Sequence, residues 1–364
     1  MSAVDATLDV EPTRSMQSAR LPRLAPLIVL VATLALSALG ALLLGWAWGT
    51  KWIAVPIVGV GLADIVLPLW SAVVENRRAA VDRLVTCLVW TALACALVPL
   101  AWVLAKTIIE GAPVINGSFL SENGVGHFDP VQLIKVGGHG VFHALVGTLV
   151  VTVCATIISV PVGLMCAIYL VEYARGKWLG RAVTVLVDVM TGIPSIVAGL
   201  FALSLFTVFF GNGTRLGIMG AVALSLLMIP TVVRASEEMM RLVPSDLREA
   251  AYALGVPKWR TIVKVVIPTA VGGLVTGVTL AVARVVGETA PLLVTVGALD
   301  NTNWNPFHDK MTTIPVLISN AQSTNSPDDL KTAWGAALLL ILIVMILNLA
   351  ARIIGKIFAP KTGR

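Results

Sequence analysis

Long apolar runs separated by short polar segments dominate the chain. About 20 apolar residues in a helix cross the hydrocarbon core of a membrane, and eight runs are long enough to do so. We expect spans at Leu24–Trp48, Ile53–Val73, Leu84–Leu104, Ala144–Val171, Val183–Phe210, Leu216–Val233, Gly272–Val296 and Trp334–Ile354. Lipid offers no water to an exposed backbone, so the spans are predicted to be α-helices in a polytopic, all-α transmembrane bundle.

Composition agrees with a membrane protein. The chain is 57% hydrophobic and 13% charged, with a mean hydropathy of +0.90, whereas soluble domains carry about 25% charged residues. The first run follows a basic head and could imitate a signal peptide. Its roughly 25 apolar residues exceed the usual 7–15 of a signal h-region, so we expect a retained anchor.

Lysine and arginine positions predict the orientation. With the N-terminus in the cytoplasm, 19 of the 26 fall in inside segments and 6 in outside segments, leaving Arg284 within a span. Cytoplasmic loops of membrane proteins carry this excess, so both termini are expected in the cytoplasm. The net charge of +6 therefore indicates orientation. No basic cluster is interleaved with aromatic residues as a nucleic-acid platform requires, so no nucleic-acid partner is expected.

Sites for catalysis, cofactors or metal ions are not predicted. The sequence contains no G-x4-G-K-[ST], G-x-S-x-G or H-E-x-x-H, so we expect neither an enzyme nor a nucleotide site in this chain. The four cysteines fall within spans, and no structural disulfide is expected. The four histidines fall in predicted outer segments: His127, His139, His143 and His308. Their spacing matches no strong ligand pattern, which favours solvated loop histidines over the alternatives of a metal site or a pH sensor.

A polar, basic island from Glu237 to Lys264 separates two apolar runs. Within it, Ser245 is predicted to cap a helix, Glu249 to lie near its first turn, and Gly255 to end it. The sequence Glu249-Ala250-Ala251, then Gly255 and Pro268, has the spacing EAA-x3-G-x9-apolar-x-apolar-Pro. This spacing resembles the cytoplasmic EAA loop of ABC import permeases, which sits in a cleft of the ATPase.

The resemblance to that loop implies that six residues couple the chain to an ATPase: Ser245, Glu249, Ala250, Ala251, Gly255 and Pro268. The alternative is an ordinary amphipathic connector between two spans.

The seventh predicted span contains an intramembrane charge. Arg284 lies at the midpoint of Gly272–Val296. Inserting an arginine at the centre of a membrane helix costs about 2.5–3.5 kcal/mol, so such a residue is taken first as a candidate functional residue. Glu288 follows at i+4, on the same face of the expected helix. Pro291 clashes with the carbonyl of Gly287, so a kink is expected there. The pattern predicts an anion pathway, and a structural ion pair is the alternative; the two are compatible.

The seventh predicted span, with three other stretches, indicates a particular group of ABC import permeases. Four stretches are similar to the A-type permease subunits of bacterial phosphate ABC importers, the Pst systems: Gly287–Leu293, Pro194–Phe201, Ala167–Ala174, and Leu242–Pro244 through Lys258-Trp259. The C-type subunits of that family typically follow Gly-Glu-Thr with Met, whereas here Ala-Pro-Leu-Leu follows. The resemblance runs from about Asn76 to the C-terminus.

Membership would imply a type I ABC importer permease of the MetI-like fold, with a core of six helices, in the bacterial plasma (inner) membrane. The residues of the seventh span themselves predict a substrate pathway at Arg284, Glu288 and Thr289, with a helix break at Gly287 and Pro291. The implied protein partners are a C-type phosphate permease subunit, two ATPase subunits that bind ATP and Mg²⁺, and an extracytoplasmic phosphate-binding protein. Membrane lipid would surround the complex, and inorganic phosphate would be its substrate.

The predicted organisation has three parts. Residues 1–23 form a cytoplasmic tail, 24–75 an additional transmembrane hairpin, and 76–364 the importer domain with its EAA loop at about 238–268. The hairpin departs from the six-span pattern and contains a lone intramembrane acid, Asp64, which we expect to pair with the core. Two long outer segments, Thr107–Gly140 and Ala298–Ala333, are expected to contact something outside the membrane.

The sequence thus predicts a permease subunit of an ATP-driven inorganic phosphate importer. Two alternatives are a permease for another oxyanion, of the sulfate or molybdate type, and an ion-coupled secondary transporter. The EAA-like loop argues against the secondary transporter.

Overall fold

The computed structural model describes residues 21–22, 24–43, 53–124, 127–129, 134–136, 140–174, 176–324 and 326–358. The predicted tail at 1–20 and the turn at Trp48–Trp52 lie outside the described residues, as do the side chains of His127 and His139.

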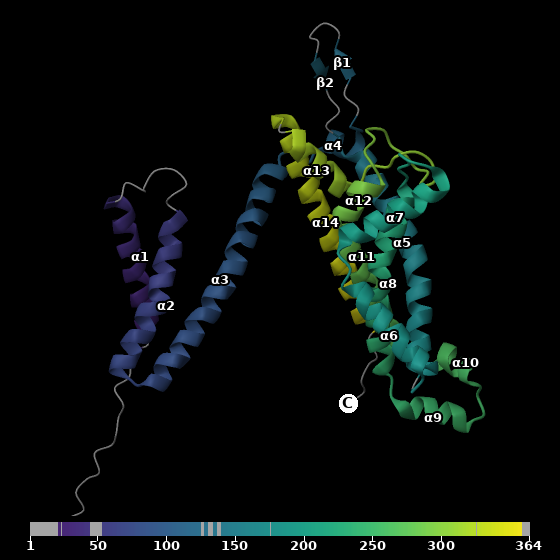
Figure 1. The fold of residues 1–364 in the computed structure, drawn as a ribbon, viewed down its shortest axis with the longest axis horizontal. Helices are drawn as coiled ribbons and strands as arrows, with labels where there is room; N and C mark the ends of the chain where they lie inside the picture. Colours follow the sequence, from purple (N-terminus) through teal and green to yellow (C-terminus); the bar gives the residue numbers. More distant parts are fainter. Residues whose placement is uncertain are drawn as a thin grey trace, which may run out of the picture. The chain divides into compact units, whose positions relative to one another are not determined.

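The described chain is almost entirely helical (Figure 1). Its elements in chain order are α1 (Ala25–Leu43), α2 (Ala54–Val74), α3 (Arg77–Gly111), α4 (Gly117–Ser121), β1 (His127–Asp129), β2 (Ile134–Val136), α5 (Phe142–Ile168), the π-helical turn η2 (Tyr169–Tyr173), α6 (Trp178–Thr191), α7 (Ser195–Phe210), α8 (Gly217–Arg241), α9 (Ser245–Ala253), α10 (Lys258–Thr261), the π-helical turn η3 (Ile262–Val266), α11 (Ile267–Val286), α12 (Ala290–Thr295), α13 (Ile314–Thr324) and α14 (Pro327–Phe358). The two short strands pair antiparallel between α4 and α5.

Within the described residues, seven helices are long and apolar enough to cross a membrane, or up to eight if one bent pair counts as a single span. The bent pair replaces the predicted span Val183–Phe210: α6 and α7 meet at 104°. Pro194 explains the break, because a proline disfavours helical backbone at the residue before it. The apolar run alone did not reveal this bend.

The chain divides into two compact units, Met1–Leu104 and Ala105–Arg364. In the first, α1 packs against α2 around Leu21, Ala25, Val29, Ala63 and Leu67. Asp64, expected to pair with the core of the importer domain, accepts hydrogen bonds from Thr91 Oγ1 at 2.9 and 3.1 Å. Thr91 belongs to α3, which contains the first predicted core span, Leu84–Leu104.

Glu75 joins the ends of the first unit's helices. Its carboxylate accepts hydrogen bonds from Ser71 Oγ at 2.7 Å and from the Leu21 amide at 2.7 Å. Arg83 donates two further hydrogen bonds to this carboxylate, from Nη2 to Oε1 at 2.9 Å and from Nε to Oε2 at 3.0 Å. These hydrogen bonds, first that of Ser71, lower the pKa of Glu75 from 4.5 to about 2.

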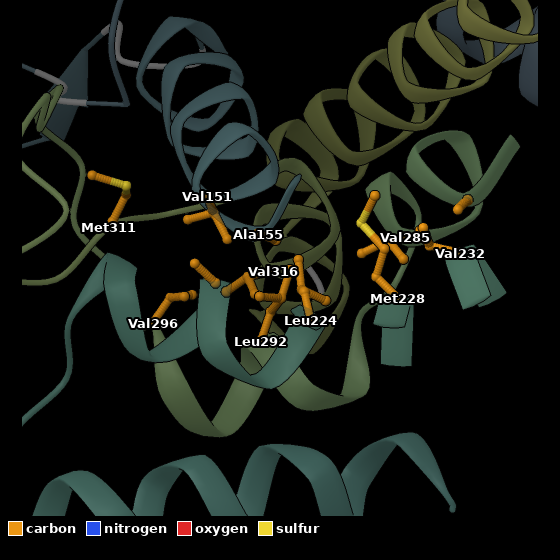
Figure 2. Close-up of a cluster of buried hydrophobic side chains, with 12 residues drawn as sticks. Val151, Ala155, Leu224, Met228, Val232, Val285, Leu292, Val296, Met311 and Val316 are labelled. Carbon is orange, nitrogen blue, oxygen red and sulfur yellow. The ribbon is translucent and has the colours of Figure 1, made fainter. Parts of the chain in front are cut away.

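The second unit is built around α8, which packs against α5 and α11. Figure 2 shows the buried cluster between these helices and α12, in which Leu224 and Met228 of α8 meet Val151 of α5 and Val285 of α11. Helix α14 covers α11 and α13. Figure 1 places α9 and α10 at one end of this unit, and α4, α13 and the strand pair at the opposite end.

The second predicted outer loop is largely ordered structure. Residues 298–333 contain all of α13 and the start of α14. Ile314 and Val316 of α13 are apolar and buried, and this burial holds the segment in place. The two predicted outer segments touch: Thr302 Oγ1 donates to Asn123 Oδ1 at 2.6 Å. His143 is buried and accepts from the Gly124 amide at 3.1 Å. All four cysteine thiols are free.

Candidate functional site

The motif around residue 250 forms a short helix, α9, at one end of the second unit. Pro244, with extended backbone, precedes its first residue, and Asp246 is the acid of its first turn. The predicted roles of two residues are wrong. Ser245 does not cap the helix, because its hydroxyl donates to Asp246 Oδ1 at 3.3 Å. Glu249 lies a turn further on, so it is not the acid that meets the positive end of the helix.

Gly255 ends this helix as predicted. Its φ is +73°, the left-handed conformation that glycine adopts at low cost. Its amide donates to the Tyr252 carbonyl at 2.9 Å, and the Val256 amide donates to the Ala251 carbonyl at 3.1 Å. These two bonds make a Schellman motif, which satisfies carbonyls left over at the helix end. A Cβ at Gly255 would meet no atom of this chain within 4 Å.

A buried ion pair that the sequence reasoning missed fixes the orientation of α9. Arg248 Nε donates to Glu172 Oε1 of η2 at 3.0 Å, with side chains 10% and 5% exposed. The remaining guanidinium nitrogens of Arg248 donate to the carbonyls of Val243 at 2.6 Å and Met240 at 2.9 Å. Lys258 Nζ donates to the Glu172 carbonyl oxygen. The signal available in the sequence was a glutamate at the end of an apolar run.

Most of the motif faces away from the protein. Glu249, Ala250, Gly255 and Pro268 are exposed, whereas Ala251 is buried. Large apolar side chains beside the motif are also exposed: Leu242 by 73%, Leu254 by 83% and Trp259 by 58%. Neighbouring exposed apolar residues of this kind mark a contact surface. We call Leu242, Glu249, Ala250, Leu254 and Trp259 the α9 surface.

The second predicted site lies where α11 ends. The helix stops at Val286, Gly287 is its C-terminal cap, and α12 begins at Ala290 with Pro291 in its first turn. A proline is tolerated there because first-turn amides lack helical acceptors. The expected kink is thus a complete break, and Thr289 is the residue immediately before α12.

This break overturns the predicted pair of Arg284 with Glu288. The helix ends before Glu288, so the i+4 relation does not hold, and within the described residues no ion pair joins the two side chains. Arg284 is also not at a span midpoint. The continuous span runs from Lys258 to Val286, which places Arg284 close to its end.

Three irregular points of the backbone converge on Arg284. A cavity of about 220 Å³ is lined by residues from the α6–α7 bend, from α8 around its internal Pro230, and from the end of α11. Ser195 at the start of α7, Arg284 and Glu288 supply polar groups to it. Arg284 is exposed and Glu288 half-buried. An arginine beside a helix N-terminus is suited to attract an anion.

Close packing of α7 on α12 supports this geometry. A Cβ at Gly199 of α7 would lie 2.7 Å from Pro291 Cα and 2.9 Å from its carbonyl oxygen. Only glycine permits this approach of α7 to α12.

Across the described residues, no group of three histidine, cysteine, aspartate or glutamate side chains could hold a metal ion.

Comparisons with known proteins identify the family of the chain. Residues 159–364 match the family model of the binding-protein-dependent transport system inner membrane component. The phosphate transport system permease protein PstA 1 of Mycobacterium tuberculosis is 45% identical over 278 residues, 76% of this chain and 90% of that protein. PstA of Yersinia pestis is 37% identical over 72% of this chain and 84% of that protein.

Among solved structures, the inward-facing MetNI methionine ABC transporter is 22% identical with a TM-score of 0.48, covering 60% of this chain and 94% of that one. The family model spans more than half of the chain, and the PstA relatives are matched across most of their own length. The chain therefore belongs to the inner-membrane permeases of binding-protein-dependent transport systems, among the PstA phosphate transport permeases.

Proposed function

We propose that this chain forms one half of the membrane pore of an ATP-driven importer of inorganic phosphate. The observation that carries the proposal is the 45% identity to PstA 1 of Mycobacterium tuberculosis over 76% of the chain. The sequence has no phosphate-cradling P-loop. ATP and Mg²⁺ therefore belong to separate ATPase subunits, and this chain carries no cofactor.

The proposed assembly contains a C-type phosphate permease subunit, two ATPase subunits and an extracytoplasmic phosphate-binding protein. The N- and C-termini lie in the cytoplasm of a multi-pass protein of the bacterial inner membrane. The lysine and arginine excess supports this orientation, and within the second unit α9 lies at the end opposite α4 and α13.

Coupling to the ATPase is assigned to the α9 surface. Its exposed apolar residues would enter a cleft of the ATPase, while Gly255 allows close approach because it carries no side chain. The buried contact of Arg248 with Glu172 transmits any displacement of α9 to the end of α5. Ser245, Glu249, Ala250, Ala251 and Pro268 complete the proposed coupling segment.

The substrate pathway is assigned to the α11–α12 break. Arg284 would meet the phosphate oxygens, with Glu288 and Thr289 beside it, and the break at Gly287 and Pro291 leaves backbone groups available there. Among the residues that the structure describes, no carboxylate forms an ion pair with Arg284, so its guanidinium is available to a passing anion. Broken helices that aim their ends at an anion are a recurring device in transporters.

The pathway is tested with Arg284→Gln in the complete, membrane-inserted importer. Phosphate uptake should be abolished while assembly with the ATPase is retained, because the variant loses the charge without losing an ion pair. Wild-type uptake by the assembled variant would remove Arg284 from the pathway. The matched control is Arg215→Gln, an arginine that bonds the neighbouring Thr214 carbonyl outside this cavity.

Competition separates the oxyanion alternatives. Excess unlabelled sulfate or molybdate should leave phosphate uptake unchanged, and strong inhibition by either would favour a permease for that anion. Uptake that persists without any copurifying ATPase would favour the ion-coupled secondary transporter.

Orientation is tested with single cysteines and an impermeant thiol reagent. Cysteines replacing Ser121 and Asp328 should react in intact cells, and those replacing Arg78 and Lys258 only after lysis. External labelling at position 258 would overturn both the orientation and the coupling assignment.

A further inference from the structure

A second cavity lies at the α9 end of the protein, away from the proposed pathway. It has a volume of about 560 Å³ and is formed by η2, the start of α6 and the last turns of α8. Lys177, Arg181 and Arg241 line it together with a single carboxylate, Glu237. The lining residues thus carry three positive charges and one negative charge, a net charge of +2.

The carboxylate of Glu237 is already neutralised. Its side chain is 5% exposed and accepts from Arg234 at 2.8 Å and from Arg241 at 2.5 Å. Arg241 remains 66% exposed, so part of its guanidinium faces outward. In the part of the chain that the structure describes, Lys177 and Arg181 form no ion pair. The cavity therefore holds cationic groups that lack a counter-ion.

The backbone adds to this positive field. Lys177 is the N-terminal cap of the 14-residue helix α6, and its side chain makes no capping bond. The amides of the first turn, Trp178 to Gly180, have no acceptor further back in the helix. Gly180 lines the cavity, and a Cβ there would lie 2.8 Å from the Ala174 carbonyl oxygen, so its glycine keeps the preceding loop close to the helix.

Apolar side chains line the cavity as well. Leu170 and Val185 line it beside the cationic groups, and Trp178 next to it is 73% exposed. An exposed tryptophan beside basic residues is typical of the boundary between lipid and water. Basic pockets between transmembrane helices on the cytoplasmic side bind phosphate-bearing head groups.

We propose that Lys177, Arg181 and Arg241, with the N-terminus of α6, form a binding site for a phosphate group. The ligand is the head group of an anionic phospholipid or inorganic phosphate, because both present the same oxygens to these donors. The site is separate from Arg284 and does not depend on the proposed transport pathway.

Lipid binding is tested with the full chain in nanodiscs of phosphatidylcholine mixed with phosphatidylglycerol. Native mass spectrometry then measures the phosphatidylglycerol retained. Each lysine or arginine near an anionic surface contributes about fivefold, so Lys177→Gln with Arg181→Gln should weaken retention on the order of thirtyfold. The control removes two exposed cations outside the cavity, Lys264→Gln with Arg352→Gln, and should retain lipid as the wild type does.

Inorganic phosphate is tested by calorimetry with the full chain in nanodiscs of phosphatidylcholine alone. All samples carry Arg284→Gln, so that the proposed pathway does not contribute. A further variant, Thr184→Trp, fills the cavity and leaves every charge in place. Thr184→Trp should weaken the binding of either ligand. Size-exclusion elution and helix content verify that the variant is inserted and folded.

Retention of phosphatidylglycerol alone would identify a lipid site, and binding of inorganic phosphate alone would identify a site for the free ion. Three results would overturn the proposal: binding of neither probe, an equal loss in the control variant, or undiminished binding by Thr184→Trp.

Discussion

Replacing Arg248 by methionine should release α9 from the rest of the protein. Methionine keeps most of the aliphatic bulk but removes every donor. The Glu172 carboxylate, 5% exposed, is then left without its cation, and the carbonyls of Val243 and Met240 lose their bonds. Removing one partner of a buried ion pair costs about 3–5 kcal/mol.

Most of this cost should appear as local opening of α9. The helix is nine residues long and only Arg248 and Ala251 within it are buried, so few other contacts hold it. If opening becomes easier by about 3 kcal/mol, amide protection falls by more than about a hundredfold. Hydrogen exchange of the full chain, followed by mass spectrometry on peptides that cover 245–255, measures this directly.

Two further variants make the measurement decisive. Arg260→Met removes an exposed cation from the neighbouring α10 and should change protection little, because exposed substitutions usually stay within about 0.5 kcal/mol. Glu172→Gln combined with Arg248→Met should recover part of the lost protection, since no uncompensated charge remains buried. Protection of α9 in Arg248→Met within about threefold of the wild type would refute the reasoning.

Three other substitutions test separate parts of the structure. Gly255→Leu forces a branched side chain into φ +73°, which costs about 1–2 kcal/mol, and the side chain fills the open space beside the α9 surface. ATPase copurification and phosphate uptake should both fall. Normal values for both would reject the coupling role. Gly199→Val places methyl groups against Pro291 and should lower stability by about 1–3 kcal/mol and reduce uptake, whereas a thermal midpoint equal to the wild type would show that α7 and α12 separate freely. Glu75→Gln should destabilise the first unit at neutral pH. Because hydrogen bonds, first that of Ser71, lower the pKa of Glu75 to about 2, the difference from the wild type should persist above pH 4.5 and vanish as the pH falls towards 2; melting curves across that range check the sign.

The sequence alone determined the features that depend on local chemistry. Apolar run length located the spans, because about 20 residues must cross the hydrocarbon core. Gly255 was identified as a helix end, because glycine is the residue that takes a positive φ without strain. The resemblance of Gly287–Leu293 and of the EAA-like spacing identified the family, which the PstA relatives confirm. The roles of Arg284 and of the coupling residues remain predictions.

Only the tertiary structure decided which distant residues meet. Glu172 and Arg248 are 76 positions apart, so no periodicity could pair them. Arg284 and Glu288 were expected one turn apart because the helix was taken to continue as far as Glu288, but α11 ends at Val286 and α12 starts at Ala290. The bend between α6 and α7 was hidden because the apolar run continues through both halves, and apolarity reports affinity for lipid, not the direction of the chain. Convergence of that bend with the α11–α12 break around Arg284 arises from packing across the whole bundle, which no local pattern encodes.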